Sequence, residues 1–439
     1  MALGTPAART TPEPAGRAPE FSEAYTRYAL GLLLVVYVVN FLDRQVVAIL
    51  LQAIKQDLGL SDMQLGAFSG IAFAALYSTL GIPLARWADR GVRRSIIALA
   101  LLVWSGMTAL QGVAPTFFWL VLARVGVGIG EAGCSPPAHS MIADLFEPKR
   151  RATALSIYAL GIPIGGAIGL AGGGWLREAF DWRTALVVVG LPGLVLALLV
   201  RLTLREPTRG WWEGGRGQRE PPPSLGEVAR LLWKRRAFVH MAIAGALHAF
   251  YGYGAGAFNP AFLERVHGLA PLEIGAWLGA IAATTGVAGT FLGGWLTDRL
   301  SHRDLRWYAW IPGWGSVIAV PFVLLFYLWD EGREALALAA LPAILGGLYL
   351  GPTFAMTQAL VPPRMRAQAA AVLLLVLNLI GMGLGPQIVG LLSDLLEPRF
   401  GVESIRWALL ATIVVGALWS AVHYFAAAKT LREDLQAAA

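Results

Sequence analysis

The fold is decided by one stretch of the chain, Ala123-Arg124-Val125-Gly126-Val127-Gly128-Ile129-Gly130-Glu131-Ala132-Gly133. Its arginine and glutamate are seven residues apart, so both side chains fall on one face of a helix. The apolar segment around them, residues 116–145, is long enough at about 1.5 Å per residue to cross a hydrocarbon core of about 30 Å. Charge at that depth is costly and needs a reason. We interpret it as a proton or substrate relay facing a water-filled cavity, with a buried structural ion pair as the alternative.

The composition extends this interpretation to the whole chain. Of 439 residues, 56% are hydrophobic and 14% are charged, whereas soluble proteins carry about 25% charged residues. Apolar segments recur about every 30 residues, at 28–53, 63–86, 94–114, 116–145, 152–177, 183–203, 237–264, 272–297, 307–329, 334–360, 367–395 and 405–428. The sequence therefore predicts an all-α membrane protein with twelve transmembrane helices.

The basic residues predict the orientation in the membrane. Lys and Arg number 26 in the two tails and the loops after even-numbered helices, but 7 in the loops after odd-numbered helices. Short loops retained in the cytoplasm carry this excess, so we expect a multi-pass protein of the cell inner membrane with both termini cytoplasmic. The same asymmetry accounts for the net charge of +7, and no nucleic-acid partner is expected.

Two motifs that each occur twice in the sequence indicate an internal duplication. The pair Asp298-Arg299 follows Asp89-Arg90 by 209 residues, and Pro363 follows Pro148 by 215 residues in a similar basic context. Two pseudo-symmetric six-helix bundles explain both spacings. The predicted domains are a disordered cytoplasmic tail (1–22), an N-terminal bundle (23–203), a cytoplasmic linker with an amphipathic helix (204–236), a C-terminal bundle (237–430) and a cytoplasmic tail (431–439).

Helix 1 carries polar residues that suit the same buried site. Asp43 and Arg124 are expected at one depth, with Glu131 deeper, near the level of Tyr37 and Asn40. Arg124 would then choose between two carboxylates, and protonation of either would bias that choice. For Arg44, a snorkelling or headgroup-facing role remains open.

The loop after helix 2 resembles that of the major facilitator superfamily, whose pattern is G-x-x-x-D-R-x-G-R-R. Asp89, Arg90, Arg93 and Arg94 match it, while Ala85 and Val92 replace the two glycines. The resemblance implies a conformational latch in which the loop acid meets the start of helix 11, favoured by the partial positive charge there. In this chain Asp89 would face the region of Arg366. Its repeat, Asp298 with Arg299, would face the start of helix 5 near Arg151.

Three further motifs look like the spinster branch of that superfamily. They are Asn40-Phe41-Leu42-Asp43-Arg44, Arg124 with Gly130-Glu131-Ala132, and Arg205-Glu206-Pro207-Thr208-Arg209-Gly210. The resemblance implies export or flipping of lysophospholipids or sphingosine-phosphate-like lipids. It also implies coupling to protons, with Asp43, Arg124 and Glu131 as the switch. The compact loops and the Ala/Gly/Arg-rich composition indicate a bacterial member.

The distribution of charge favours an amphipathic substrate. The equivalent depths of the second half carry no charged residue, so a polar headgroup would meet the first half and an apolar tail the second. The expected substrate contacts are Tyr37, Asn40, Arg44, Tyr253, Phe258 and Asn378. A drug or metabolite exporter of the same fold is the competing interpretation. We expect no enzyme activity, cofactor or metal, and a monomer.

Overall fold

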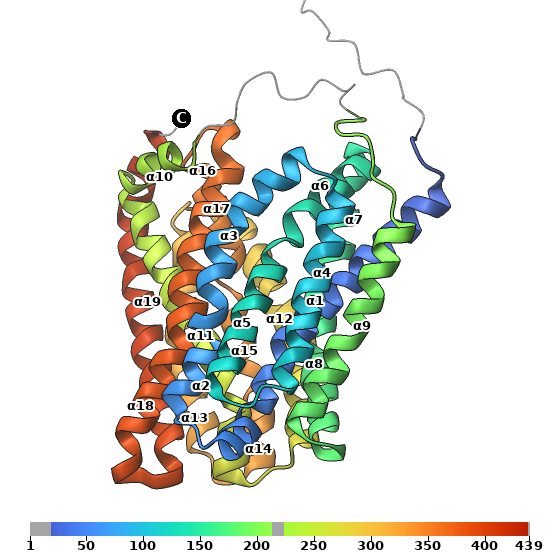
Figure 1. Cartoon of the computed structure of the whole chain (residues 1–439). Helices are drawn as coiled ribbons and strands as arrows, with labels where there is room; N and C mark the ends of the chain where they lie inside the picture. The colour runs from blue at the N-terminus through green and yellow to red at the C-terminus, as the bar shows by residue number, and fades with distance from the viewer. Residues whose placement is uncertain (1–18, 213–223, 438–439) are drawn as a thin grey trace, which may run out of the picture.

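The structure, a computed structural model, describes residues 19–212 and 224–437. Within these ranges every regular element is a helix and no strand occurs, which confirms the all-α prediction. Figure 1 shows the start of α1 and the end of α19 at the same end of the molecule, here called the terminal face; the other end is the opposite face. Most of the expected tail over 1–22 and part of the expected linker lie outside the described residues.

The helices follow the predicted segments closely. The first bundle contains α1 (Glu23–Leu58), α2 (Asp62–Ser69), α3 (Ile71–Arg90), α4 (Arg93–Gly112), α5 (Phe117–Ala132), α6 (Ser135–Leu145), α7 (Pro148–Ala159), α8 (Gly161–Ala179) and α9 (Trp182–Thr203). After α10 (Leu225–Trp233), the second contains α11 (Arg236–His267), α12 (Pro271–Ser301), α13 (Trp307–Leu328), α14 (Gly332–Leu338), α15 (Ala340–Gly347), α16 (Leu350–Ala359), η1 (Pro363–Met365), α17 (Arg366–Val376), η2 (Leu377–Leu384), α18 (Gly385–Phe400), η3 (Gly401–Glu403) and α19 (Ser404–Gln436).

Ten helical stretches of the described residues are long and apolar enough to cross a membrane. One of them, Pro363–Gln436, is 74 residues long and holds two predicted segments, 367–395 and 405–428. The remaining predicted segment, 237–264, corresponds to α11, a 32-residue helix outside that set whose sequence includes several histidines. The chain is therefore a multi-pass membrane protein.

Several predicted helices are broken along their length. The segment 116–145 divides between α5 and α6 at Gly133 and Cys134, because α6 starts with two prolines that cannot donate a helical hydrogen bond. At the matching place in the second bundle, Leu348 and Tyr349 separate α15 from α16. Between α17 and α18, η2 is π-helical, a geometry that often marks functional sites.

Close backbone contacts hold the two bundles together toward the opposite face. An added Cβ at Gly275 of α12 would collide with the carbonyl oxygen of Leu170 on α8. A Cβ at Gly390 of α18 would likewise collide with the carbonyl oxygen of Asp62 on α2. Only glycine allows backbones to approach this closely, so these crossings are seams between the bundles.

Candidate functional site

A buried ion pair lies at the centre of the first bundle. The Nε atom of Arg44, on α1, donates to Oε2 of Glu131, on α5, at 2.5 Å. The Glu131 side chain has no exposed surface, and that of Arg44 is 15% exposed. Glu131 occupies the last turn of α5, next to the break before α6, so the break places it inside the protein.

The pairing differs from the sequence expectation. Arg124 was expected to hold Glu131 or Asp43, but Arg44 is the partner of Glu131 in this conformation. Oδ2 of Asp43 instead accepts a hydrogen bond from the hydroxyl of Thr108 at 2.5 Å. Asp43 and Arg44 are neighbours on α1, so their side chains point about 100° apart around the helix, and helix packing decides which of them faces Glu131.

Arg124 lies among these charges without a hydrogen-bonded partner for two of its nitrogen atoms. Its Nε and Nη1 are buried and form no hydrogen bond with described residues. Its guanidinium carbon lies 4.9 Å from the ring centre of Phe73 and 5.8 Å from that of Phe68. Such contacts stabilise a cation by about 0.5–2 kcal/mol and leave the guanidinium nitrogens available to a new acceptor.

Aromatic rings also hold Arg44 in the interior. Its guanidinium carbon lies 4.4 Å from the ring centre of Tyr77 and 5.0 Å from those of Phe41 and Phe73. A snorkelling arginine would place its head at the membrane surface. That alternative is wrong in this conformation, because the head pairs with Glu131 inside the bundle.

A cavity of about 1250 Å³ opens from this site toward the terminal face. Glu131, Tyr77 and Asn378 line its deep end. Tyr77 lies about three helical turns further from the terminal face than Asp89 on the same helix, α3. The mouth of the cavity is reached by Asp89, by Asp144 and by residues of the linker, as well as by the start of α17. Glu131 is thus the member of the buried charge group that meets the cavity.

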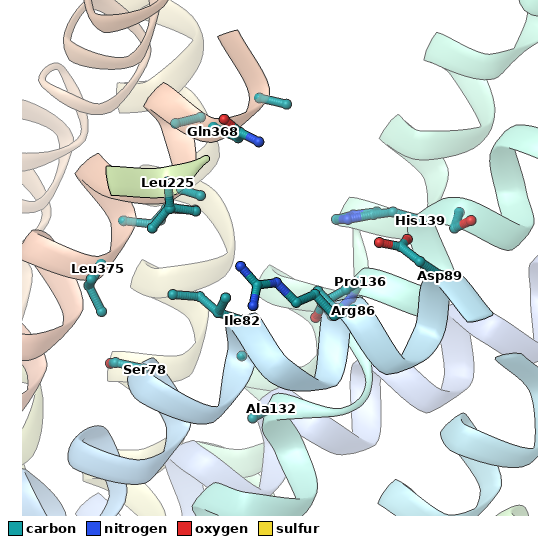
Figure 2. A pocket seen from close by; sticks show the side chains of 18 of the residues that line it. Ser78, Ile82, Arg86, Asp89, Ala132, Pro136, His139, Leu225, Gln368 and Leu375 are labelled. Atoms are coloured by element: carbon teal, nitrogen blue, oxygen red, sulfur yellow. The ribbon is translucent and has the colours of Figure 1, made fainter. Parts of the chain in front are cut away.

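The walls of the cavity differ between the two bundles. Figure 2 shows Arg86, Asp89 and His139 on one side and Leu225, Gln368 and Leu375 across from them. The second-bundle lining is formed by Ala367, Gln368, Ala370, Ala371, Leu374, Leu375 and Asn378. Every charged residue of the lining belongs to the first bundle or to the linker segment bound to it. The cavity therefore has one charged wall and one mainly apolar wall.

The opposite face is closed by ionic contacts between the bundles. Arg265 of α11 donates two hydrogen bonds of 2.6 Å to the carboxylate of Asp62 on α2, which also binds Lys55 at 2.8 Å. Asp394 of α18 accepts from the first two backbone N–H groups of α2. A capping box formed by Ser61 and Gln64 starts α2. No local pattern in the sequence predicted the cross-bundle partners of this helix start.

A second bidentate pair closes the same face. Arg177 of α8 binds Glu264 of α11 through two hydrogen bonds of 2.6 Å, and it also donates to the backbone carbonyl of Ile49. These contacts join the bundles at the face away from the cavity mouth. The molecule is open to the terminal face and closed to the opposite face.

The residues expected to form a latch do not pair across the bundles in this conformation. Asp89 and Ala367 line the cavity, and the Asp89 carboxylate is exposed without an ion pair to a described residue. Asp298 is also exposed, and Arg299 lies over the ring of Trp295 at 5.4 Å. Because the latch was expected for the state that is closed at this face, its pairs are separated here.

In this conformation Arg93 and Arg94 bind the linker segment, and the latch expected of them stays a prediction for the closed state. Arg93 is fully buried, pairs with Asp144 and donates to Glu206 at 2.7 Å. Arg94 contacts Glu206 through its backbone N–H and the carbonyl oxygen of Leu204 through its side chain. Both arginines therefore clamp the linker segment onto the first bundle.

The remaining expected substrate contacts are distributed unevenly. Asn378 lines the cavity, and Asn40 lies beside Glu131 with its amide lacking a hydrogen-bonded partner. Tyr37 stacks on Tyr158 behind the cavity wall, with ring centres 4.3 Å apart. Tyr253 is 42% exposed.

Phe258 is a core residue here, fully buried between helices. Its ring has no free surface and is not part of the cavity lining, so contact with a substrate would require that core to repack. Within the second bundle, the apolar surface that does face the cavity belongs to α17.

Two helix bundles that are sealed at one face and enclose a cavity open at the other have the architecture of a membrane transporter. Residues 33–386 match the model of the Major Facilitator Superfamily, and the chain belongs to that family. Its members are transporters, so the protein is not an enzyme.

Curated relatives agree with this assignment. An "MFS-type efflux pump" of Mycolicibacterium smegmatis is 35% identical over 411 residues, covering 93% of this chain and 94% of the relative. Human "Protein spinster homolog 1" is 30% identical, covering 89% of this chain and 79% of the relative. The "Sphingosine-1-phosphate transporter SPNS2" of Xenopus tropicalis is 28% identical, covering 87% and 76%.

A solved structure is similar over nearly the whole chain. It is a bacterial homologue of the human lysosomal transporter Spinster, described as inward-facing and unoccupied. It has a TM-score of 0.85 and 34% identity, and covers 94% of this chain and 99% of that one. The resemblance to the spinster branch is thereby confirmed.

Proposed function

We propose that the protein is a proton-coupled exporter of amphipathic lipids of the lysophospholipid or sphingosine-phosphate type. The observation that carries this proposal is a single arrangement: the Arg44–Glu131 pair at the deep end of a cavity with one charged and one apolar wall. A lipid headgroup anion would meet arginines through charge-assisted hydrogen bonds, and its acyl chain would lie along α17. The relatives named for spinster and sphingosine-1-phosphate support the substrate class.

Proton coupling follows from what protonation does to the ion pair. A proton on Glu131 would remove the charge that holds Arg44 and free its guanidinium for a substrate anion. Arg124 lies nearby with unpaired nitrogen atoms, so it could take over a carboxylate as the helices move. Either exchange would favour one of two relative positions of α1 and α5. In this way one proton would shift a two-state equilibrium.

The topology belongs to the same proposal. We take the terminal face as cytoplasmic in a bacterial inner membrane, because the excess of basic residues lies there. The open conformation would then face inward, ready to receive lipid from the cytoplasmic side. A thiol placed at exposed Arg303 should react with an impermeant reagent only after cells are opened, and the single native cysteine, Cys134, is buried.

The test of coupling is Glu131→Gln. We expect the variant to lose the pH-driven change in distance between spin labels placed on α3 and α17 at the terminal face. Glu206→Gln is the matched control, because it removes a carboxylate from an arginine pair near the surface, outside the buried charge group. A normal pH response in Glu131→Gln would show that Glu131 is not the switch.

A metabolite or drug exporter is the second candidate, favoured by the identity to the mycobacterial efflux pump. Purified protein in vesicles with an imposed pH gradient separates the two. Flux of a labelled lysophospholipid or sphingoid phosphate supports the lipid proposal. Flux of a hydrophilic compound with no lipid binding or movement would support the competitor.

A further inference from the structure

A line of polar side chains runs along α4 from its end at the opposite face to Asp43. Ser105, Thr108 and Gln111 recur every three residues, so they share one side of the helix. All three are buried, with exposures of 1%, 0% and 0%. The Thr108 hydroxyl donates to Oδ2 of Asp43, which joins this line to the buried charge group.

Several atoms along this line have no hydrogen-bonded partner among the described residues. They are Oε1 and Nε2 of Gln111, Oγ of Ser105 and Oδ1 of Asp43. A buried polar group without a partner costs about 1–3 kcal/mol, and clusters of such groups are normally satisfied by internal water. An apolar residue would fill each of these positions on α4 more cheaply if the helix needed only to pack.

Only one turn of chain separates Gln111 from the opposite face. Val113 follows it and is 65% exposed, and the carbonyl of Ala114 is held by Arg183 at 2.6 Å. Asp57 pairs with the same arginine at 2.9 Å. This single turn separates Gln111 from the opposite face, and two surface side chains, from α1 and α9, hold it in place.

The charges around Asp43 divide its surroundings into two sides. Arg44 is its neighbour on α1, and Arg124 and Glu131 face it from α5. Asp57 and Arg183 are the charged groups at the outer end of the polar line. The cavity reaches Glu131, whereas Asp43 is 1% exposed and lies outside the cavity lining.

We propose that Thr108 and Gln111 form the opposite-face limb of the proton pathway, linking Asp43 to that surface through bound water. Gln111 holds water by its amide. The Thr108 hydroxyl gives its proton to Asp43 as it takes one from the adjacent water. That water regains a proton from the solvent at the opposite face through the water held by Gln111, so the hydroxyl and the water both end unchanged. Glu131 exchanges protons with the cavity, on the other side of the buried charge group. This inference rests on the proton coupling proposed above and adds the route by which the second side is reached.

The test uses vesicles in which only one orientation of the protein carries a fluorophore pair at the terminal face. The solution on either side is then jumped in pH, and the rate of the distance change is recorded. We expect Thr108→Val and Gln111→Leu to slow the response to a jump at the opposite face at least tenfold. In both variants the response to a jump at the terminal face should keep the parent rate. Thr108→Ser, which keeps the hydroxyl, should respond to a jump at the opposite face at the parent rate.

Thr412→Val is the matched control, because this buried threonine donates only to the carbonyl of Ala408 on its own helix. It should respond like the parent from both sides. Equal slowing from both sides in the Thr108 and Gln111 variants would indicate a structural role and overturn the pathway. Unchanged rates would overturn it too. A parent that responds to neither jump would refute proton coupling itself, which distinguishes that failure from failure of the route.

Discussion

The two bundles share one plan but bury different chemistry at equivalent places. In the first, Asn40 of α1 lies beside Glu131 just before the break between α5 and α6. In the second, His248 follows Asn40 by 208 residues, and its Nε2 donates to the carbonyl of Gly346 at 2.9 Å, just before the break between α15 and α16. Gly346 follows Glu131 by 215 residues, so the same helix contact recurs. The break recurs in both bundles. In the first, Glu131 also forms the ionic contact with Arg44, whereas in the second the contact of His248 with Gly346 is neutral.

The neutral contact is fully satisfied, which the ionic one is not. Nδ1 of His248 accepts from the hydroxyl of Tyr251 at 2.7 Å, and its ring stacks on Tyr349 with centres 4.0 Å apart. In the first bundle, Oε1 of Glu131 and both amide atoms of Asn40 have no partner among the described residues. Satisfied polar networks fix one arrangement, whereas a partly satisfied group can adopt another. The first bundle is therefore the switching half in our proposal, and the second is the scaffold and apolar wall.

The largest expected effect comes from breaking the ionic contact. Arg44→Leu leaves Glu131 buried without its partner, and breaking a buried pair typically costs about 3–5 kcal/mol. His248→Phe keeps the stacked ring but leaves the Gly346 carbonyl unpaired, at about 1–3 kcal/mol. Thermal unfolding in detergent should show the larger loss for Arg44→Leu, with the pH response retained in His248→Phe. Equal losses would mean that the two contacts are energetically alike.

A second comparison concerns how each bundle fastens its loops at the terminal face. The first bundle buries Arg93 among Asp144, Ser140 and Glu206. Arg93→Ala should cost about 1.5–3 kcal/mol, the usual value of a hydrogen bond to a charged group, because its carboxylate partners can reach solvent. It should also release the linker segment, which protease cleavage near Thr208 would report. Protection equal to the parent would show that Arg93 does not hold the linker.

Much of this arrangement could be predicted from the sequence, because it depends on composition and spacing. Hydropathy predicted the all-α membrane architecture, and the charges in the first half predicted a lopsided site. The partner of Glu131 could not be predicted, because Asp43 and Arg44 are adjacent and only packing sets the rotation of α1. The Asp62–Arg265 contact joins residues 203 apart, and no local pattern signals it. His248 could not be singled out from the sequence, because its partner is a backbone carbonyl.

The smallest expected effect tests the loop contact of the second bundle, at Asp304 between α12 and α13. The Arg306 guanidinium, followed by the Arg306 backbone N–H and Arg432, holds the pKa of the Asp304 carboxyl well below its usual range. A carboxyl with a lowered pKa stabilises the fold above its unfolded pKa of about 4, and this contribution disappears as the pH falls through the folded value. Asp304→Asn should therefore have a slightly lower melting temperature than the parent at pH 7. The two melting temperatures should converge as the pH falls below about 4. Asp298→Asn, which removes an exposed carboxylate without an ion pair to a described residue, should show no such pH-dependent difference. If the difference in melting temperature between the parent and Asp304→Asn stays constant across this pH range, the loop contact of Asp304 is not electrostatic. The second bundle would then lack a stabilising ionic contact at this loop, as it does at its centre.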